Sequence, residues 1–190
     1  AQTSHANVAI GHQSLTLQSA DGYTFNTAVG YNSGQQVTSG SQQVLIGSYA
    51  GDALTTGAQN VAIGYKALTG EDTGNKNIAI GTNALEVLDY NGDGYNIAIG
   101  HNAGSAMTTG VYNTILGGQA GDALTTGSDN IAIGVNALST EDAHGRNVAI
   151  GRDALKLQNA GIDGYNTAIG YVAGANVTTG TENTLIGGQT

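Results

Sequence analysis

The chain is built on one five-residue phrase, seen most plainly as Asn77-Ile78-Ala79-Ile80-Gly81, in which an amide opens a short apolar stretch and a glycine closes it. The phrase recurs from end to end, and its amides form a column: Asn7, Asn26, Gln43, Asn60, Asn77, Asn96, Asn113, Asn130, Asn147, Asn166 and Asn183. Their spacing runs 19, 17, 17, 17 and then starts again, so four units make a super-repeat of 70 residues. Short repeats that cannot each bury an apolar face are typical of solenoids. The sequence therefore predicts a rod with a patterned surface rather than an enzyme with a pocket.

The expected fold class is all-β: a parallel β-solenoid, or β-roll, of about ten coils of 17 or 19 residues. We expect one segment over 1–190, with super-repeats at 7–76 and 77–146 and an incomplete one at 147–190. Two short strands joined by glycine turns are predicted in each coil.

Two kinds of apolar position alternate along each predicted strand. The residues one and three after the amide are β-branched almost throughout, as in Val61 and Ile63, and they share a face. The residue between them is Ala except in every fourth coil, where it is Leu45, Ile115 or Leu185. Both faces are therefore expected to be covered. One is the solenoid interior, and the Ala-rich face suits close approach of a second sheet in the same coil or in a neighbouring chain.

Charge excludes two classes of partner. The net charge is −9, from 14 acidic and 5 basic residues, which opposes binding to nucleic acid or to anionic membranes. No apolar run approaches the ~18 residues of a membrane span, so membrane insertion is not predicted either.

Catalysis has little support in the sequence. The four histidines do not recur at equivalent places in the coils, and no nucleophile or paired-carboxylate pattern is present. Glu71-Asp72 and Glu141-Asp142 are interpreted as charged edges that discourage sideways sheet addition. The amide column is interpreted as structural, because stacked amides hydrogen-bond to one another and to turn backbone. We therefore expect no enzyme activity and no organic cofactor.

One segment has the opening spacing of a calcium loop. Asp89, Asn91 and Asp93 place three oxygen-bearing side chains at alternate positions before a glycine. The twelfth position is Gly100 instead of the glutamate that completes such a loop. Calcium is therefore one hypothesis for this segment, and a turn in which Asp caps and Gly takes a positive φ is the alternative.

Variable side chains follow the glycine that closes each phrase. Tyr31, Tyr65, His101, Arg152 and Tyr171 stand at this place in different coils. Tyrosine, histidine and asparagine beside turn glycines are the composition of surfaces that stack on sugars and hydrogen-bond to them. These five residues are candidate receptor or glycan contacts, with an ordinary solvated edge as the alternative.

Around Asn60-Val61-Ala62-Ile63-Gly64-Tyr65-Lys66-Ala67 the sequence resembles the head repeats of trimeric autotransporter adhesins of the YadA type. Similar phrases occur in bacteriophage tail fibres. The resemblance extends over the whole repeated region and implies a left-handed parallel β-roll, commonly three chains side by side, located outside the cell or on a virion and contacting a surface. It implies no catalytic residues.

Two functional hypotheses follow. The first is a structural and adhesive segment of an extracellular, cell-surface or virion fibre that binds a host-surface glycan or protein receptor multivalently. The second is a filament subunit that binds only copies of itself. Both ends of the sequence fall within a coil, so end-to-end assembly is an alternative to a homotrimer.

Overall fold

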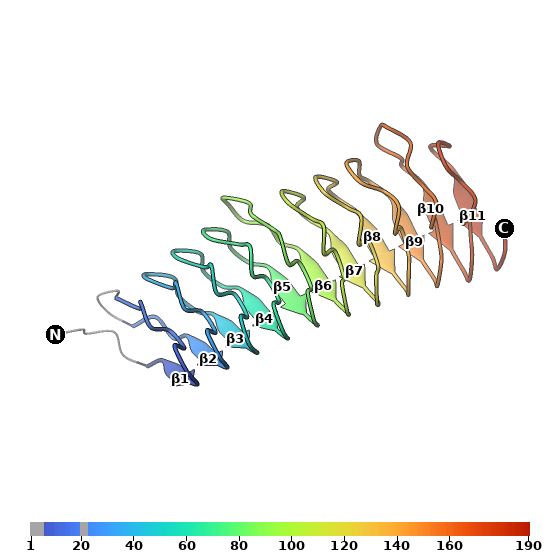
Figure 1. Ribbon diagram of the computed structural model, residues 1–190. Coiled ribbons are helices and arrows are strands. Elements are labelled where there is room, and N and C mark those ends of the chain that lie inside the picture. Colours follow the sequence, from blue (N-terminus) through green and yellow to red (C-terminus); the bar gives the residue numbers. More distant parts are fainter. Residues whose placement is uncertain (1–5, 20–22) are drawn as a thin grey trace.

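The computed structural model describes residues 6–19 and 23–190. It is a rod of stacked coils with the first and last strands at opposite ends (Figure 1). Each phrase forms a strand of three residues, and the strands are β1 (Val8–Ile10), β2 (Thr27–Val29), β3 (Val44–Ile46), β4 (Val61–Ile63), β5 (Ile78–Ile80), β6 (Ile97–Ile99), β7 (Thr114–Leu116), β8 (Ile131–Ile133), β9 (Val148–Ile150), β10 (Thr167–Ile169) and β11 (Thr184–Ile186). They form one parallel sheet in sequence order. The predicted all-β parallel solenoid is confirmed.

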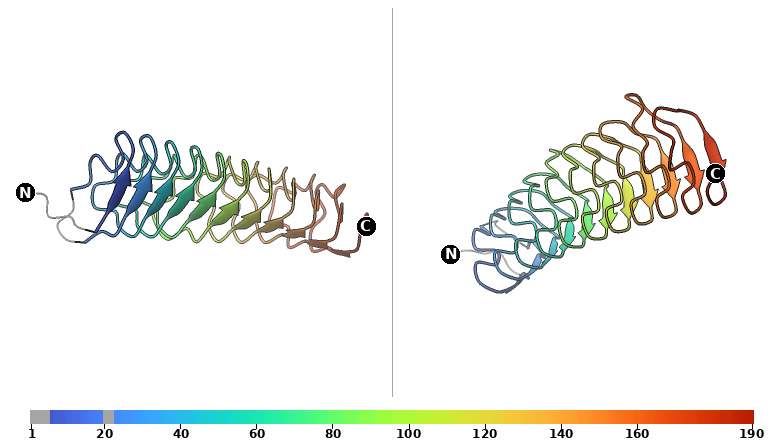
Figure 2. Two further views of the ribbon diagram at one scale, coloured as in Figure 1. Left: turned by 90° about the horizontal axis from the view of Figure 1, so that it is seen from below. Right: turned by 45° about the vertical axis from the view of Figure 1, so that its right-hand side comes forward.

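The prediction of a second strand in each coil is wrong. The described part of the return half consists of turns, which Figure 2 shows along the side of the coils opposite the strands. The cause lies in the backbone, because left-handed residues such as Asn83 (φ 56°) and Leu85 (φ 49°) interrupt an extended chain. The turns still hydrogen-bond from coil to coil, as in Leu85 N–H to Ala103 O (3.1 Å) and Asp89 N–H to Thr108 O (2.8 Å). Stacked turns thus replace the second sheet.

The central residue of each strand points into the rod. Alanine at this position is fully buried in seven strands: Ala28, Ala62, Ala79, Ala98, Ala132, Ala149 and Ala168. Buried side chains of the return half, such as Ala67 and Leu68, belong to the same core. The alanine face is therefore covered by the turns of its own coils. The expectation that it approaches a second sheet, in its own coil or in a neighbouring chain, is wrong.

Large and small residues compensate inside the coils. Leu45 takes the place of alanine in β3, and glycines stand where other coils carry leucine in the return half. A Cβ added to Gly34 would lie 2.6 Å from Leu45 Cδ1, and one added to Gly51 would lie 2.8 Å from Leu45 Cδ2. The glycines thus provide the volume that the larger strand residue occupies, which keeps the interior close-packed.

The amide column forms a continuous ladder along the rod. Each side-chain oxygen accepts the backbone N–H of the amide residue in the following coil, at distances from 2.8 to 3.2 Å. Most of the side-chain nitrogens reach across the coil, as in Asn60 Nδ2 to Gly74 O (2.8 Å) and Asn113 Nδ2 to Gly127 O (2.9 Å). The column is buried from Asn26 to Asn166. Its polar groups hold successive coils together and hold each coil closed.

Candidate functional site

The first and third residues of every strand point outward and form a continuous face, here called the outer strand face. It consists only of valine, isoleucine, leucine and threonine. Ile97 and Ile131 are each 37% exposed, and Leu116 is 43% exposed. The expectation that both strand faces are covered is therefore wrong for a single chain. Eleven strands spaced by ~4.8 Å and three residues wide give a flat apolar face of about 500 Å².

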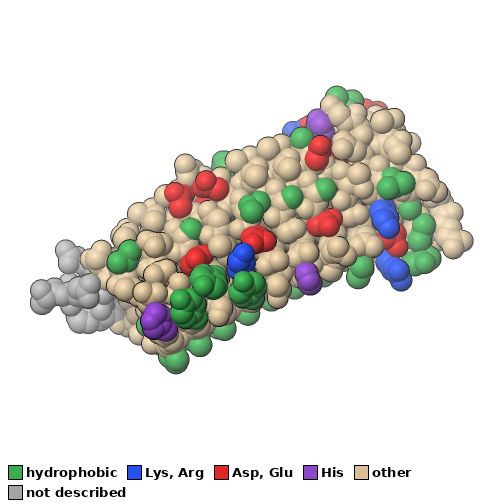
Figure 3. Space-filling model, viewed as in Figure 1, with side chains coloured by type: hydrophobic (Ala, Val, Ile, Leu, Met, Phe, Trp, Pro, Cys, Tyr) green, Lys and Arg blue, Asp and Glu red, His purple; other side chains and the backbone are tan. Residues whose placement is uncertain are grey.

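An aromatic ladder lies at the edge of the outer strand face where the strands end. His12 stacks on Tyr31 with ring centroids 5.3 Å apart and planes 8° apart. Tyr31 meets Tyr49 edge-on at 5.4 Å, and Tyr49 meets Tyr65 at 6.2 Å. These residues come from four successive coils and form what we call the tyrosine ladder. Figure 3 shows hydrophobic side chains gathered beside a histidine toward the N-terminal end of the rod.

The other predicted contact residues lie farther along the same edge. All five candidates are exposed. Tyr31 and Tyr65 belong to the tyrosine ladder. Arg152 and Tyr171 occupy the same position in consecutive coils, where Val172 N–H donates to Arg152 O (2.9 Å). His101 lines a shallow hollow of about 360 Å³. The five therefore share one edge in three separate groups.

A second aromatic column, on the opposite edge, was missed from the sequence. Its members stand directly before the amide of each phrase. Tyr95 and Tyr112 stack at 5.8 Å, and Lys76 Nζ lies 4.9 Å from the Tyr95 ring. Arg146 lies over Tyr165 at 5.5 Å. We call this set the pre-amide column. Its signal in the sequence was the tyrosine that ends two of the 19-residue coils, Tyr95 and Tyr165.

The three candidate calcium ligands have different neighbours. Asp89 lies in a group with Glu71 and Asp72, one ligand atom of each being within 4.8 Å of the others. Asp93 accepts a hydrogen bond from Lys76 Nζ at 2.6 Å. Asn91 Oδ1 accepts the hydroxyl of Thr73. The structure thus gives Asp89 carboxylate neighbours from the preceding coil and gives Asp93 a cation.

The glutamates Glu71 and Glu141 are buried, so their interpretation as charged edges is wrong. Glu71 occupies the interior position that Leu54 and Leu88 fill in the coils before and after. Its Oε1 accepts Gly74 N–H (2.7 Å) and its Oε2 accepts Tyr90 N–H (3.3 Å). Burial raises the pKa of Glu71 to about 7, although these two backbone donors favour the charged form.

The raised pKa of Glu71 predicts a pH-dependent stability. Since the folded pKa exceeds the unfolded value of 4.5, folding favours the protonated carboxyl. The contribution is fully present below about pH 4.5 and is lost as pH rises through about 7. The free energy of unfolding should fall by on the order of 3 kcal/mol over this range. Urea titrations from pH 4 to 8 measure it. Glu71→Gln should remove most of this fall in the free energy of unfolding, whereas Glu182→Gln, at an exposed position, should leave the fall unchanged. The same pH dependence in both variants would contradict the assignment of the fall to Glu71.

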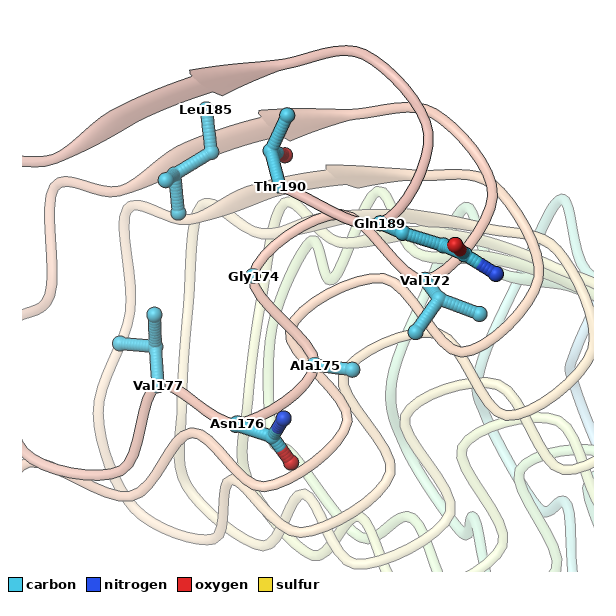
Figure 4. A pocket seen from close by; sticks show the side chains of 8 residues that line it. All are labelled: Val172, Gly174, Ala175, Asn176, Val177, Leu185, Gln189 and Thr190. Carbon is cyan, nitrogen blue, oxygen red and sulfur yellow. The ribbon is translucent and has the colours of Figure 1, made fainter.

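A hollow of about 570 Å³ opens at the final coil. Figure 4 shows Leu185 and Val177 pointing into it from opposite sides. Both positions correspond to core positions of earlier coils, such as Leu45 and Leu54. The hollow is thus the solenoid interior seen through its last coil, and it brings no set of reactive groups together.

Comparison of the chain with protein-family models, with curated proteins and with solved structures gives no match. Within the described residues there is no helix with the length and apolar character that a membrane span requires.

Proposed function

We propose that the chain is a structural and adhesive segment of a fibre outside the cell or on a virion, in which copies associate side by side and present the tyrosine ladder to a surface. One observation carries this proposal: an uncharged outer strand face runs the length of the rod and is flanked by the tyrosine ladder and the pre-amide column.

Lateral association is supported by the size of the outer strand face. At about 500 Å² it lies at the upper end of the apolar patches that monomeric proteins expose. A stable interface buries about 800 Å² per partner, so the flanking edge residues would have to contribute to it as well. Flat parallel faces of identical repeats are also complementary along their whole length. A homotrimer, as the resemblance to adhesin heads implies, is the assembly that we propose.

Adhesion is supported by the tyrosine ladder. Its rings stack in successive coils, with His12, Tyr31 and Tyr65 exposed and Tyr49 partly exposed, and tyrosine offers an apolar ring with a polar tip at small entropic cost. Such rings stack on sugar faces, and repeats at a fixed spacing turn weak contacts into avidity. Glycans of a host surface are therefore the ligand class that we propose.

A glycan array tests the adhesive role. We expect hits whose apparent affinity falls at least about tenfold when Tyr31 and Tyr65 are both replaced by alanine, since each ring contributes on the order of 1 kcal/mol. Tyr165→Ala is the matched control, because this tyrosine is similarly exposed but belongs to the pre-amide column. A silent array, or equal binding by all variants, would reject adhesion through the ladder. Silence together with self-association would favour the filament that binds only its own copies.

A further inference from the structure

Three potential metal ligands meet in the return half of the coil between β8 and β9. Glu141, Asp142 and His144 each offer one ligand atom, and these atoms lie within 4.8 Å of one another. The Glu141 side chain is fully buried, His144 is partly buried and Asp142 is exposed. The group therefore reaches from the solenoid interior to the surface, which gives an ion a path from solvent.

Buried atoms in this group lack partners. Glu141 Oε2 and His144 Nδ1 make no hydrogen bond within the described chain. Glu141 Oε1 accepts only a long bond from His144 N–H (3.4 Å) and lies 3.4 Å from His144 Nδ1. At the same column position one coil later, Gln158 is also buried with both amide atoms unpaired. Unpaired buried polar groups are costly, so a group that binds them is expected.

The first super-repeat provides an internal comparison. Glu71 stands 70 residues before Glu141 and is equally buried, yet both of its oxygens accept backbone N–H groups, from Gly74 and Tyr90. The residue equivalent to His144 is Gly74. The second super-repeat thus carries an imidazole beside a carboxylate that has one unpaired oxygen and one long hydrogen bond.

The backbone around the three ligands is held by neighbouring coils. Asp142 O accepts the hydroxyl of Thr125 (2.9 Å), and His144 O accepts Asn130 Nδ2 of the amide ladder (3.3 Å). Ligands on a backbone fixed in this way lose little entropy when they bind an ion.

We propose that Glu141, Asp142 and His144 bind a divalent transition-metal ion, and that Zn²⁺ fits the ligand set. One imidazole and two carboxylates are ligands that zinc accepts at 2.0–2.2 Å, with water completing a tetrahedron. Tetrahedral ligands at that distance lie about 3.4 Å apart, so ligand atoms that lie within 4.8 Å of one another need to approach by at most about 1.4 Å. Calcium prefers six to eight oxygens and is disfavoured by the imidazole. The bound ion compensates the buried carboxylate and ties the interior of the coil to its surface turn.

Titration calorimetry of the untagged, chelator-treated protein with ZnCl₂ tests this site. We expect one Zn²⁺ per chain and a higher melting temperature that EDTA reverses, and Co²⁺ should give the visible absorption of a low-symmetry site. His144→Gly should weaken Zn²⁺ binding about 100-fold. This variant places at 144 the residue that the first super-repeat carries there, Gly74, so its fold should be retained.

Two controls separate this site from other groups. His101→Ala removes an exposed histidine in another coil, and Glu71→Gln removes the equivalent buried carboxylate. Both variants should bind Zn²⁺ as the parent chain does, while Glu141→Gln should bind it much more weakly. Absence of binding to the parent chain, or equal loss in His101→Ala and His144→Gly, would overturn the assignment.

Discussion

Replacing Gly81 by alanine is expected to destabilise the rod by about 3 kcal/mol or more. Gly81 closes β5 with φ at +135°, a region that side chains rarely enter. An added Cβ would lie 2.3 Å from the carbonyl oxygen of Gly100 in the next coil. That contact is with backbone and cannot be relieved by a rotamer change. Because each coil is stabilised only by its neighbours, a clash in the middle of the stack weakens both halves.

Gly161→Ala is the matched control for this variant. Gly161 also has a positive φ, of 72°, but an added Cβ would have no atom within 4 Å. Its alanine variant should therefore cost only about 1 kcal/mol of backbone strain. Urea unfolding followed by circular dichroism measures both variants. Equal losses would show that the contact between coils contributes nothing.

The strands and their stacking could be predicted because the sequence repeats them. Every phrase such as Asn77-Ile78-Ala79-Ile80-Gly81 gives the strand, its end and its register. The return half could not be predicted in the same way. Leu85 and Asn83 adopt left-handed conformations there, which non-glycine residues rarely do, and neighbouring coils impose them through hydrogen bonds. The periodicity of the sequence does not indicate these left-handed conformations, because they depend on hydrogen bonds between coils.

The choice of inward face was also beyond the sequence. Hydrophobicity alone would bury Val61 and Ile63 rather than Ala62, yet Ala62 is inside. The tight turns leave room for only a methyl group opposite the strand. A larger strand residue fits only where the facing turn residue is glycine, as Leu45 does beside Gly34 and Gly51.

Of the candidate sites, one could be predicted from the sequence and the others could not. The tyrosine ladder could be predicted, because Tyr31 and Tyr65 follow the closing glycine directly. The position of the pre-amide column holds aromatic residues in some coils, such as Tyr95, and basic, amide or acidic residues in others, such as Lys76, Gln59 and Asp129, so its composition is not uniform. The burial of Glu141 was hidden because an adjacent Asp142 makes the pair look like a solvated edge.

Lysine substitutions on the outer strand face are expected to abolish lateral association. In the parent chain, light scattering should give a mass near three times 19.0 kDa. Ile97→Lys combined with Ile131→Lys places two charges per chain in the proposed interface, and each charge buried without a partner costs several kcal/mol. The mass should fall to that of one chain. Folding should be retained, because both side chains point away from the core.

Val87→Lys combined with Leu157→Lys is the matched control, since both residues are exposed apolar side chains on the return half. This variant adds the same charge and should keep the mass of the parent chain. A monomeric parent chain, or equal dissociation of both double variants, would contradict association through the outer strand face. Rods that grow in length with concentration would instead indicate end-to-end assembly. Both variants add two lysines per chain, one pair on the outer strand face and the other on the return half. The difference between their molar masses therefore measures what the outer strand face contributes to association, apart from the change in net charge.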